Sequence, residues 1–155
     1  MNFIKSIEMI KHDQYDCLIL THPESQVIDG LIEHIKKENF NVVELDLKLS
    51  ELLITVPMTE RSRFVEKWVH DFLTSYKPGP VVCTRSDLLF EPHLNIDPLA
   101  LFRQAARITR LVVLWLGDFT ENELFYAIPK HKHYRVWRMS DFIPYQPKVI
   151  LHRIT

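Results

Sequence analysis

Glycine is scarce in this sequence, with only Gly30, Gly79 and Gly117 among 155 residues. Average usage of about 7% would give roughly 11 glycines in a chain of this length. Loops that wrap phosphates depend on glycine, because their backbone adopts positive φ angles and approaches the ligand closely. The composition therefore argues against a glycine-rich phosphate loop, and no Gly-Lys pair occurs in the chain.

The sequence also has few cysteines, no long apolar run and a small net charge. Cys17 and Cys83 lie in apolar runs without a CxxC partner, which indicates two buried free thiols in a reducing compartment. No run approaches the ~18 apolar residues that cross a bilayer, and the N-terminal segment lacks the apolar stretch of a signal peptide. We therefore expect a cytoplasmic protein without a membrane partner. The formal net charge of −1 gives the whole molecule no bias toward nucleic acid.

The apolar residues that are present alternate between helical and strand-like spacing. A length of 155 residues and an apolar fraction of 46% suit a single domain, residues 1–155, with its own core. Helical spacing predicts helices over 2–11, 22–38, 48–56, 59–76 and 98–106. Strands are predicted over 17–20, 41–47, 80–84, 111–116, 124–128, 134–138 and 148–154, the last three partly antiparallel. This order predicts an α/β fold with a three-layer, mostly parallel sheet and a β-rich C-terminal end.

Two of the later helix starts have a predicted cap. Asp97 precedes Pro98, a pair typical of an N-cap followed by the first helical turn. Thr59 has the position of an N-cap for the helix over 59–76, which must end before Lys77-Pro78-Gly79-Pro80. The nearly all-apolar run 111–116 is typical of a central parallel strand that is covered on both faces.

The first strand is followed by residues 21–25, where an α/β protein would place a phosphate-binding loop. A Walker A loop reads GxxxxGK[ST], and its backbone amides and lysine hold the phosphates. Laid after this strand, the template puts His22 and Val27 at the glycines, Ile28 at the lysine and Asp29 at the hydroxyl. All four defining positions fail, so the sequence predicts at most a degenerate P-loop at Thr21, His22, Pro23, Glu24 and Ser25.

Thr21-His22-Pro23-Glu24 instead fits the capping box, Thr-x-x-Glu. In that motif the hydroxyl and the carboxylate bind the free amides at the start of a helix. The carboxylate of Glu24 would then lie where a phosphate would bind and would repel it. We expect an ordinary capped turn and no cofactor, and an ATP site with a non-standard loop stays as the alternative.

Other chemistry-bearing residues are dispersed. Asp87 and Glu91 follow the strand 80–84 too late for a Walker B pattern, so a solvated loop is expected. His131 and His133 form an HxH pair that two-ligand metal binding would suit, but no third ligand is suggested by spacing, and exposed loop histidines are expected. No nucleophile elbow occurs and no base is implied for either cysteine, so we assign no catalytic and no metal residue.

Basic residues gather in two short series. The segment 130–138 contains Lys130, Lys132, Tyr134, Arg135, Trp137 and Arg138 and has no acid. Such cations neutralise phosphates and the aromatic rings stack on bases, although a half-buried edge strand has the same pattern. Arg103 and Arg107 lie one helical turn apart, as on a solvated helix face or a face for an acidic partner. Both series are candidate surfaces for nucleic acid or for a protein partner.

The segment 81–137 contains the elements LLFEPHLNIDPLALF, LVVLWLGDF, LFYAIPKH and YRVW. In these elements the chain resembles BrxF, the family of small P-loop-type proteins of type-three BREX phage-defence systems. The resemblance implies a cytosolic bacterial component of a multi-gene system in which host DNA is methylated and phage replication is blocked. The family is described as P-loop NTPases, and the departures at His22, Val27, Ile28 and Asp29 put ATP hydrolysis by this chain in doubt.

The resemblance and the missing nucleotide motif together favour a non-enzymatic adaptor. Such a protein would have a degenerate P-loop-like fold and would dock onto larger BREX proteins through its basic or apolar faces. The alternatives are a P-loop-type protein that binds ATP and a module that binds DNA. The sequence leaves the oligomeric state open.

Overall fold

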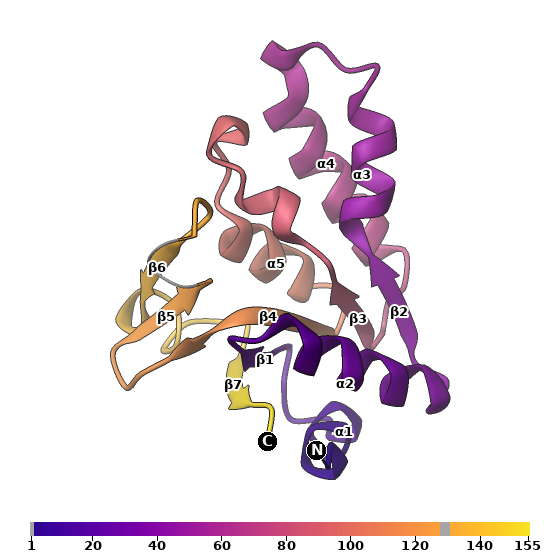
Figure 1. Ribbon diagram of the computed structural model, residues 1–155, viewed down its shortest axis with the longest axis vertical. Helices are drawn as coiled ribbons and strands as arrows, with labels where there is room; N and C mark the ends of the chain where they lie inside the picture. The colour runs from indigo at the N-terminus through magenta and orange to yellow at the C-terminus, as the bar shows by residue number, and fades with distance from the viewer. Residues whose placement is uncertain (1, 128–130) are drawn as a thin grey trace.

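The computed structural model describes residues 2–127 and 131–155, and its centre is a seven-stranded sheet (Figure 1). Five strands are parallel and lie in the order β2-β3-β4-β1-β7, and β5 and β6 extend β4 as an antiparallel ribbon. The strands are β1 Cys17–His22, β2 Asn41–Glu44, β3 Val81–Thr84, β4 Leu111–Phe119, β5 Glu123–Tyr126, β6 Arg135–Arg138 and β7 Val149–Arg153. The predicted α/β class with a mostly parallel sheet is confirmed.

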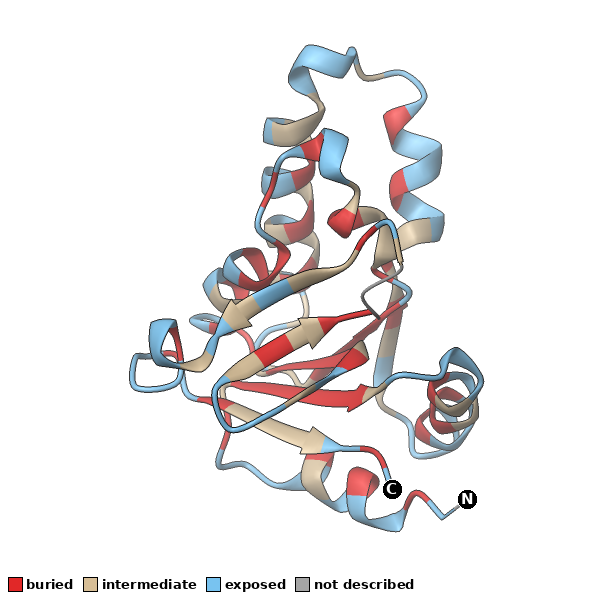
Figure 2. Cartoon of the chain, turned by 60° about the vertical axis from the view of Figure 1, so that its left-hand side comes forward, coloured by how far each residue is buried: buried red, intermediate tan, exposed pale blue. Residues whose placement is uncertain are grey.

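Helices cover both faces of the sheet. They are α1 Ile4–Lys11, α2 Ser25–Lys37, α3 Leu45–Leu53, α4 Arg61–Thr74 and α5 Pro98–Ala106, joined by the short 3-10 turns η1 Met58–Glu60, η2 Asp87–Phe90, η3 Pro92–Leu94 and η4 Met139–Asp141. Apolar residues of α1 and α2 form one core with the sheet, and those of α3, α4 and α5 form the other. The red, buried positions in Figure 2 accordingly follow the central strands.

The central strands contribute to both cores by alternation. Leu18 and Leu20 of β1 pack toward α1 and α2, whereas Cys17 and Ile19 pack toward the other three helices. The strand β4 alternates in the same way, which explains why its sequence is almost continuously apolar. Both cysteines are buried and free, as predicted. None of the helices in the described part of the chain is both long enough and apolar enough to cross a membrane.

The antiparallel ribbon of β5 and β6 is anchored by close backbone contact and by aromatic packing. A Cβ at Gly117 would collide with the carbonyl oxygen of Phe125, and Nε1 of Trp115 donates to that oxygen at 2.8 Å. The ring of Tyr126 stacks on Phe90 of η2 with centroids 3.4 Å apart. Trp137 packs edge-on against Trp115 at 5.4 Å. These contacts hold the ribbon next to η2, at the edge where the parallel strands end.

Several element boundaries differ from the prediction. The strand predicted over 41–47 ends at Glu44, and α3 begins at Leu45 because Leu45, Leu49 and Leu53 share one buried helical face. Thr59 lies within η1 and does not cap α4, whose N-cap is Glu60. The Asp97 cap is confirmed, since its carboxylate accepts the amide of Ala100 at 3.1 Å.

The late strands follow the predicted pattern. The ribbon strands β5 and β6 are antiparallel, and β7 returns to pair in parallel with β1. The strand predicted over 124–128 ends at Tyr126, and residue 128 lies outside the described residues.

Candidate functional site

A cleft of about 680 Å³ opens where the parallel strands end. Open α/β sheets bind their ligands at this edge, beyond the carboxyl ends of the strands. The acids of its lining are Asp29, Glu44, Asp46, Asp87 and Glu91, and its basic residues are Arg85, Lys132 and the imidazole of His133. Carboxylates therefore outnumber cations, which makes the cleft unfavourable for an uncomplexed triphosphate.

The β1–α2 junction borders this cleft and contains only Pro23 and Glu24. The predicted capping box is absent, because neither Thr21 nor Glu24 makes a side-chain bond to the helix start. Thr21 stays in β1, whose pairing with β4 continues to His22, and its buried hydroxyl has no hydrogen-bond partner. Nδ1 of His22 instead accepts the amide of Glu24 at 3.0 Å. The prediction was wrong because the strand extends two residues beyond Leu20.

Ser25 and Asp29 bring the first turns of α2 to the cleft wall. Opposite them, Arg85 follows β3 and has a positive φ of 50°. Its guanidinium lies 3.1 Å from Asp29 and 3.3 Å from Glu44. These half-exposed ion pairs add little stability. They do occupy the arginine that lines this part of the cleft with carboxylates of its own chain.

A buried histidine lies at the other end of the cleft. His133 is 5% exposed, and its Nε2 lies 2.9 Å from Oε2 of Glu91 in hydrogen-bond geometry. Its Nδ1 lies 2.9 Å from Oδ2 of Asp87, but this contact lacks hydrogen-bond geometry. The hydroxyl of Tyr126 donates to Oδ1 of Asp87 at 2.7 Å. The expectation of exposed loop residues was therefore wrong for His133, because the β5–β6 ribbon carries it onto η2.

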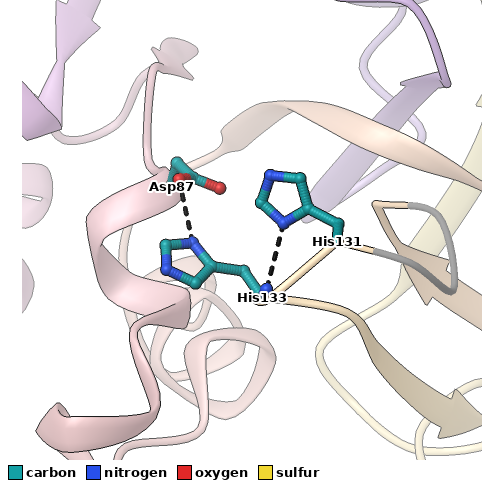
Figure 3. Close-up of side chains that lie close together, drawn as sticks. All are labelled: Asp87, His131 and His133. Atoms are coloured by element: carbon teal, nitrogen blue, oxygen red, sulfur yellow. Dashed lines mark hydrogen bonds and ion pairs between the residues drawn. The ribbon is translucent and has the colours of Figure 1, made fainter.

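His131 joins this group, which we call the His–Asp cluster: Asp87, His131 and His133 (Figure 3). One ligand atom from each of the three residues lies within 4.8 Å of the others. Nδ1 of His131 accepts the amide of His133 at 3.0 Å, and in Figure 3 the ring lies on the side of the Asp87 carboxylate. The HxH spacing is visible in the sequence, but the third member comes from a turn about forty residues earlier.

Burial changes the acidity of several groups near the cleft. It raises the pKa of Asp46 from its ordinary 3.8 to about 6, although the amide of Leu88, 2.8 Å from Oδ1, opposes the shift. The pKa of Tyr126 is raised by burial and by its bond to Asp87. The hydrogen bond with His133 lowers the pKa of Glu91. Burial also raises the pKa of Cys17 to about 12 and that of Cys83 further, so both thiols stay protonated and unreactive.

The basic segment before and within β6 does not form one charged face. The guanidinium of Arg135 donates to the carbonyls of Ile96 and Phe90, and the indole of Trp137 donates to Asp97 at 3.1 Å. Tyr134 stacks near Phe125. Lys132 and Arg138 are exposed, and Lys130 lies outside the described residues. In the other series, Arg103 is half-buried over the ring of Phe142, whereas Arg107 is exposed just beyond α5.

Comparison with known proteins gives no relative. No family model, no curated protein and no solved structure matches the chain.

Proposed function

We propose that this chain is a non-catalytic adaptor of a BREX-type phage-defence system, built on a P-loop-like scaffold whose phosphate loop is degenerate. The resemblance of segment 81–137 to the BrxF family supports the system. The parallel sheet, with β1 between β4 and β7 and followed by α2 at the carboxyl edge, supports the scaffold.

The short β1–α2 junction is the main support for proposing that this chain is non-catalytic. Two residues, Pro23 and Glu24, connect the strand to the helix. A P-loop wraps phosphates with a longer run of backbone amides and adds a lysine. This junction has neither, and the nearby Arg85 is paired with Asp29 and Glu44. A triphosphate would meet acids where it needs cations.

Titration of the full chain with Mg-ATP tests this part. We expect no saturable rise in melting temperature and no heat in calorimetry, since a ligand that binds only the folded state stabilises it. Saturable stabilisation that is lost in a Ser25→Glu variant and increased in an Asp29→Lys variant would place ATP at this junction and refute the proposal.

An ATP-binding protein is the second candidate, because one observation favours it. The helix α2 starts at the cleft wall without a side-chain cap and without an acid in its first turn. Free amides at a helix start attract anions. The Mg-ATP titration separates the two candidates directly. The DNA alternative is weaker, since Arg135 donates to two backbone carbonyls of its own chain.

An adaptor also needs a surface for its partner. The hairpin of α3 and α4 extends away from the sheet in Figure 1, and its connection is mostly exposed in Figure 2. Ile54 is 79% exposed and Met58 is 72% exposed at this tip, next to the 38% exposed Leu52. Exposed apolar patches mark sites where proteins associate. We propose that a larger protein of the same system covers this tip.

Co-purification with each product of the neighbouring defence genes, expressed one at a time, tests the tip. We expect one of them to bind the wild type, and the double variant Ile54→Asp, Met58→Glu to lose it. The matched control is Ile4→Asp, because Ile4 is 60% exposed but lies on α1. A double variant that still binds every product bound by the wild type would refute this surface, as would a wild type that binds none. Size-exclusion chromatography shows whether the tip instead pairs two copies of the chain.

A further inference from the structure

The atoms of the His–Asp cluster that face one another are those without an ordinary hydrogen bond. Oδ1 of Asp87 accepts the hydroxyl of Tyr126 at 2.7 Å, which leaves Oδ2 toward His133. Nε2 of His133 is engaged by Glu91 at 2.9 Å, which leaves Nδ1 toward Asp87. Nδ1 is buried and is without a hydrogen-bond partner.

The contact between His133 and Asp87 depends on which ring nitrogen of His133 carries the proton. A carboxylate such as Glu91 accepts hydrogen bonds, so Nε2 of His133 carries the proton that it donates. When the ring is neutral, Nδ1 presents a lone pair, and at 2.9 Å it faces the lone pairs of Asp87 Oδ2. Two acceptors at this distance repel unless a cation lies between them. A second proton on the ring does not supply it well, because the contact lacks hydrogen-bond geometry.

We propose that Asp87, His131 and His133 bind one divalent transition metal ion, with Zn²⁺ as the favoured ion. Two imidazoles and a carboxylate are a donor set that suits Zn²⁺, whereas Mg²⁺ and Ca²⁺ prefer oxygen. Ligand atoms around a tetrahedral Zn²⁺ lie about 3.3 Å apart, given bonds of about 2.0 Å. The three donors lie within 4.8 Å of one another, so side-chain rotations that bring them to this spacing would form the site.

The surrounding residues have the arrangement of outer partners in metal sites. A metal-bound histidine usually donates its second ring proton to a carboxylate, and a bound carboxylate is itself hydrogen-bonded. Glu91 and Tyr126 occupy these two positions. His131 would coordinate through Nε2, so its proton moves to Nδ1 and the bond from the His133 amide is lost. His131 is therefore the weakest ligand, and the fourth position is left to water on the cleft side.

Calorimetric titration of the tag-free, EDTA-treated full chain with ZnCl₂ tests the site, with MgCl₂ as the negative probe. We expect one equivalent of Zn²⁺ to bind and to raise the melting temperature. Co²⁺ in its place is expected to give the visible absorption of a four-coordinate site. MgCl₂ is expected to give neither heat nor stabilisation.

Four variants locate the ion. Asp87→Asn keeps an acceptor for Tyr126 and should fold, yet it should weaken Zn²⁺ binding by more than about tenfold, as should His131→Ala. Glu91→Gln still accepts from His133 and should weaken binding by about tenfold or less, because it acts through the histidine. His93→Ala is the matched control, since His93 also approaches Glu91 but is 79% exposed, and its binding should be unchanged.

Three results would overturn the proposal. One is a wild type that takes up no equivalent of Zn²⁺. Another is Zn²⁺ affinity that both Asp87→Asn and His131→Ala leave intact. The third is an equal loss in His93→Ala, which would assign the binding to surface histidines. Unfolding curves measured in EDTA establish that each variant is folded before its affinity is compared.

Discussion

The two ends of the cleft, the β1–α2 junction and the His–Asp cluster, differ in the range of their polar contacts. At the β1–α2 junction the polar groups are local: His22 accepts the amide of Glu24, two residues away, and the hydroxyl of Thr21 is buried without a partner. At the His–Asp cluster the bonds join distant segments, from Asp87 and Glu91 to Tyr126 and His133. The junction that would hold phosphate in a P-loop protein therefore has only local polar contacts. The polar contacts between distant segments lie at the other end of the cleft, beyond β3.

Among single substitutions at the two ends of the cleft, removal of the His133 side chain should reduce the free energy of unfolding most. In EDTA, His133→Ala removes the bond from Nε2 to Glu91 and leaves a cavity in place of a ring that is 5% exposed, so we expect a loss of about 2–3 kcal/mol in the free energy of unfolding. His22→Ala at the junction should cost about 1 kcal/mol or less, because it removes one exposed bond. Urea denaturation measures both, and equal losses would contradict the difference between the two ends.

Tyr126→Phe removes the hydroxyl that donates to Asp87 at 2.7 Å. We expect a loss of about 1.5 kcal/mol, because the acceptor is charged and the ring stays stacked on Phe90. Tyr145→Phe is the control, since Tyr145 is 60% exposed, and it should change stability very little. If the two variants unfold alike, the bond from Tyr126 to Asp87 does not contribute.

Asp46 makes the cleft sensitive to pH. Its folded pKa of about 6 lies above the ordinary 3.8, so folding favours the protonated acid. The associated stability is complete below pH 3.8 and is lost as the pH rises toward 6 and above. Asp46→Asn keeps the acceptor for Leu88, so at pH 7 it should stabilise by about 1 kcal/mol after allowance for solvent screening. Unfolding at pH 3.5 should show almost no difference, and a constant difference across pH would contradict the shift.

Thr21→Val should give the smallest change in the free energy of unfolding. It should stabilise the protein, whereas His133→Ala and Tyr126→Phe at the cluster should destabilise it. Its hydroxyl is buried without a partner, so a methyl group of the same shape should stabilise by about 0.5–1 kcal/mol. Thr120→Val is the control that should destabilise, because the Thr120 hydroxyl accepts the amides of Asn122 and Glu123. A destabilised Thr21→Val would mean that this hydroxyl has a partner after all.

The sequence predicted those features that local spacing determines. The continuous apolar runs of residues 17–20 and 111–116 predicted two of the parallel strands, and Asp97-Pro98 predicted the start of α5. Predicted element boundaries were wrong where strand pairing in the sheet outweighed a local sequence motif. Thr21 was expected to cap a helix, but pairing with β4 keeps it in the strand.

The candidate site was predictable only in fragments. His131 and His133 were visible as a pair, and Asp87 and Glu91 as acids after a strand. Their meeting depends on the ribbon, which is folded onto η2 by Gly117 and by the rings of Trp115 and Tyr126. No local pattern encodes that approach, so spacing along the chain supplied no third ligand.

The position of β1 has a consequence for how the protein folds. Its partners are β4 and β7, so Cys17 is joined to Leu111 on one side and to Val149 on the other. During synthesis, β1 and its apolar side chains leave the ribosome long before either neighbour exists. Pairing between such distant segments is slow, since long loops must close first. We therefore expect the apolar side chains of β1 to lack their sheet partners until β4 has been synthesised.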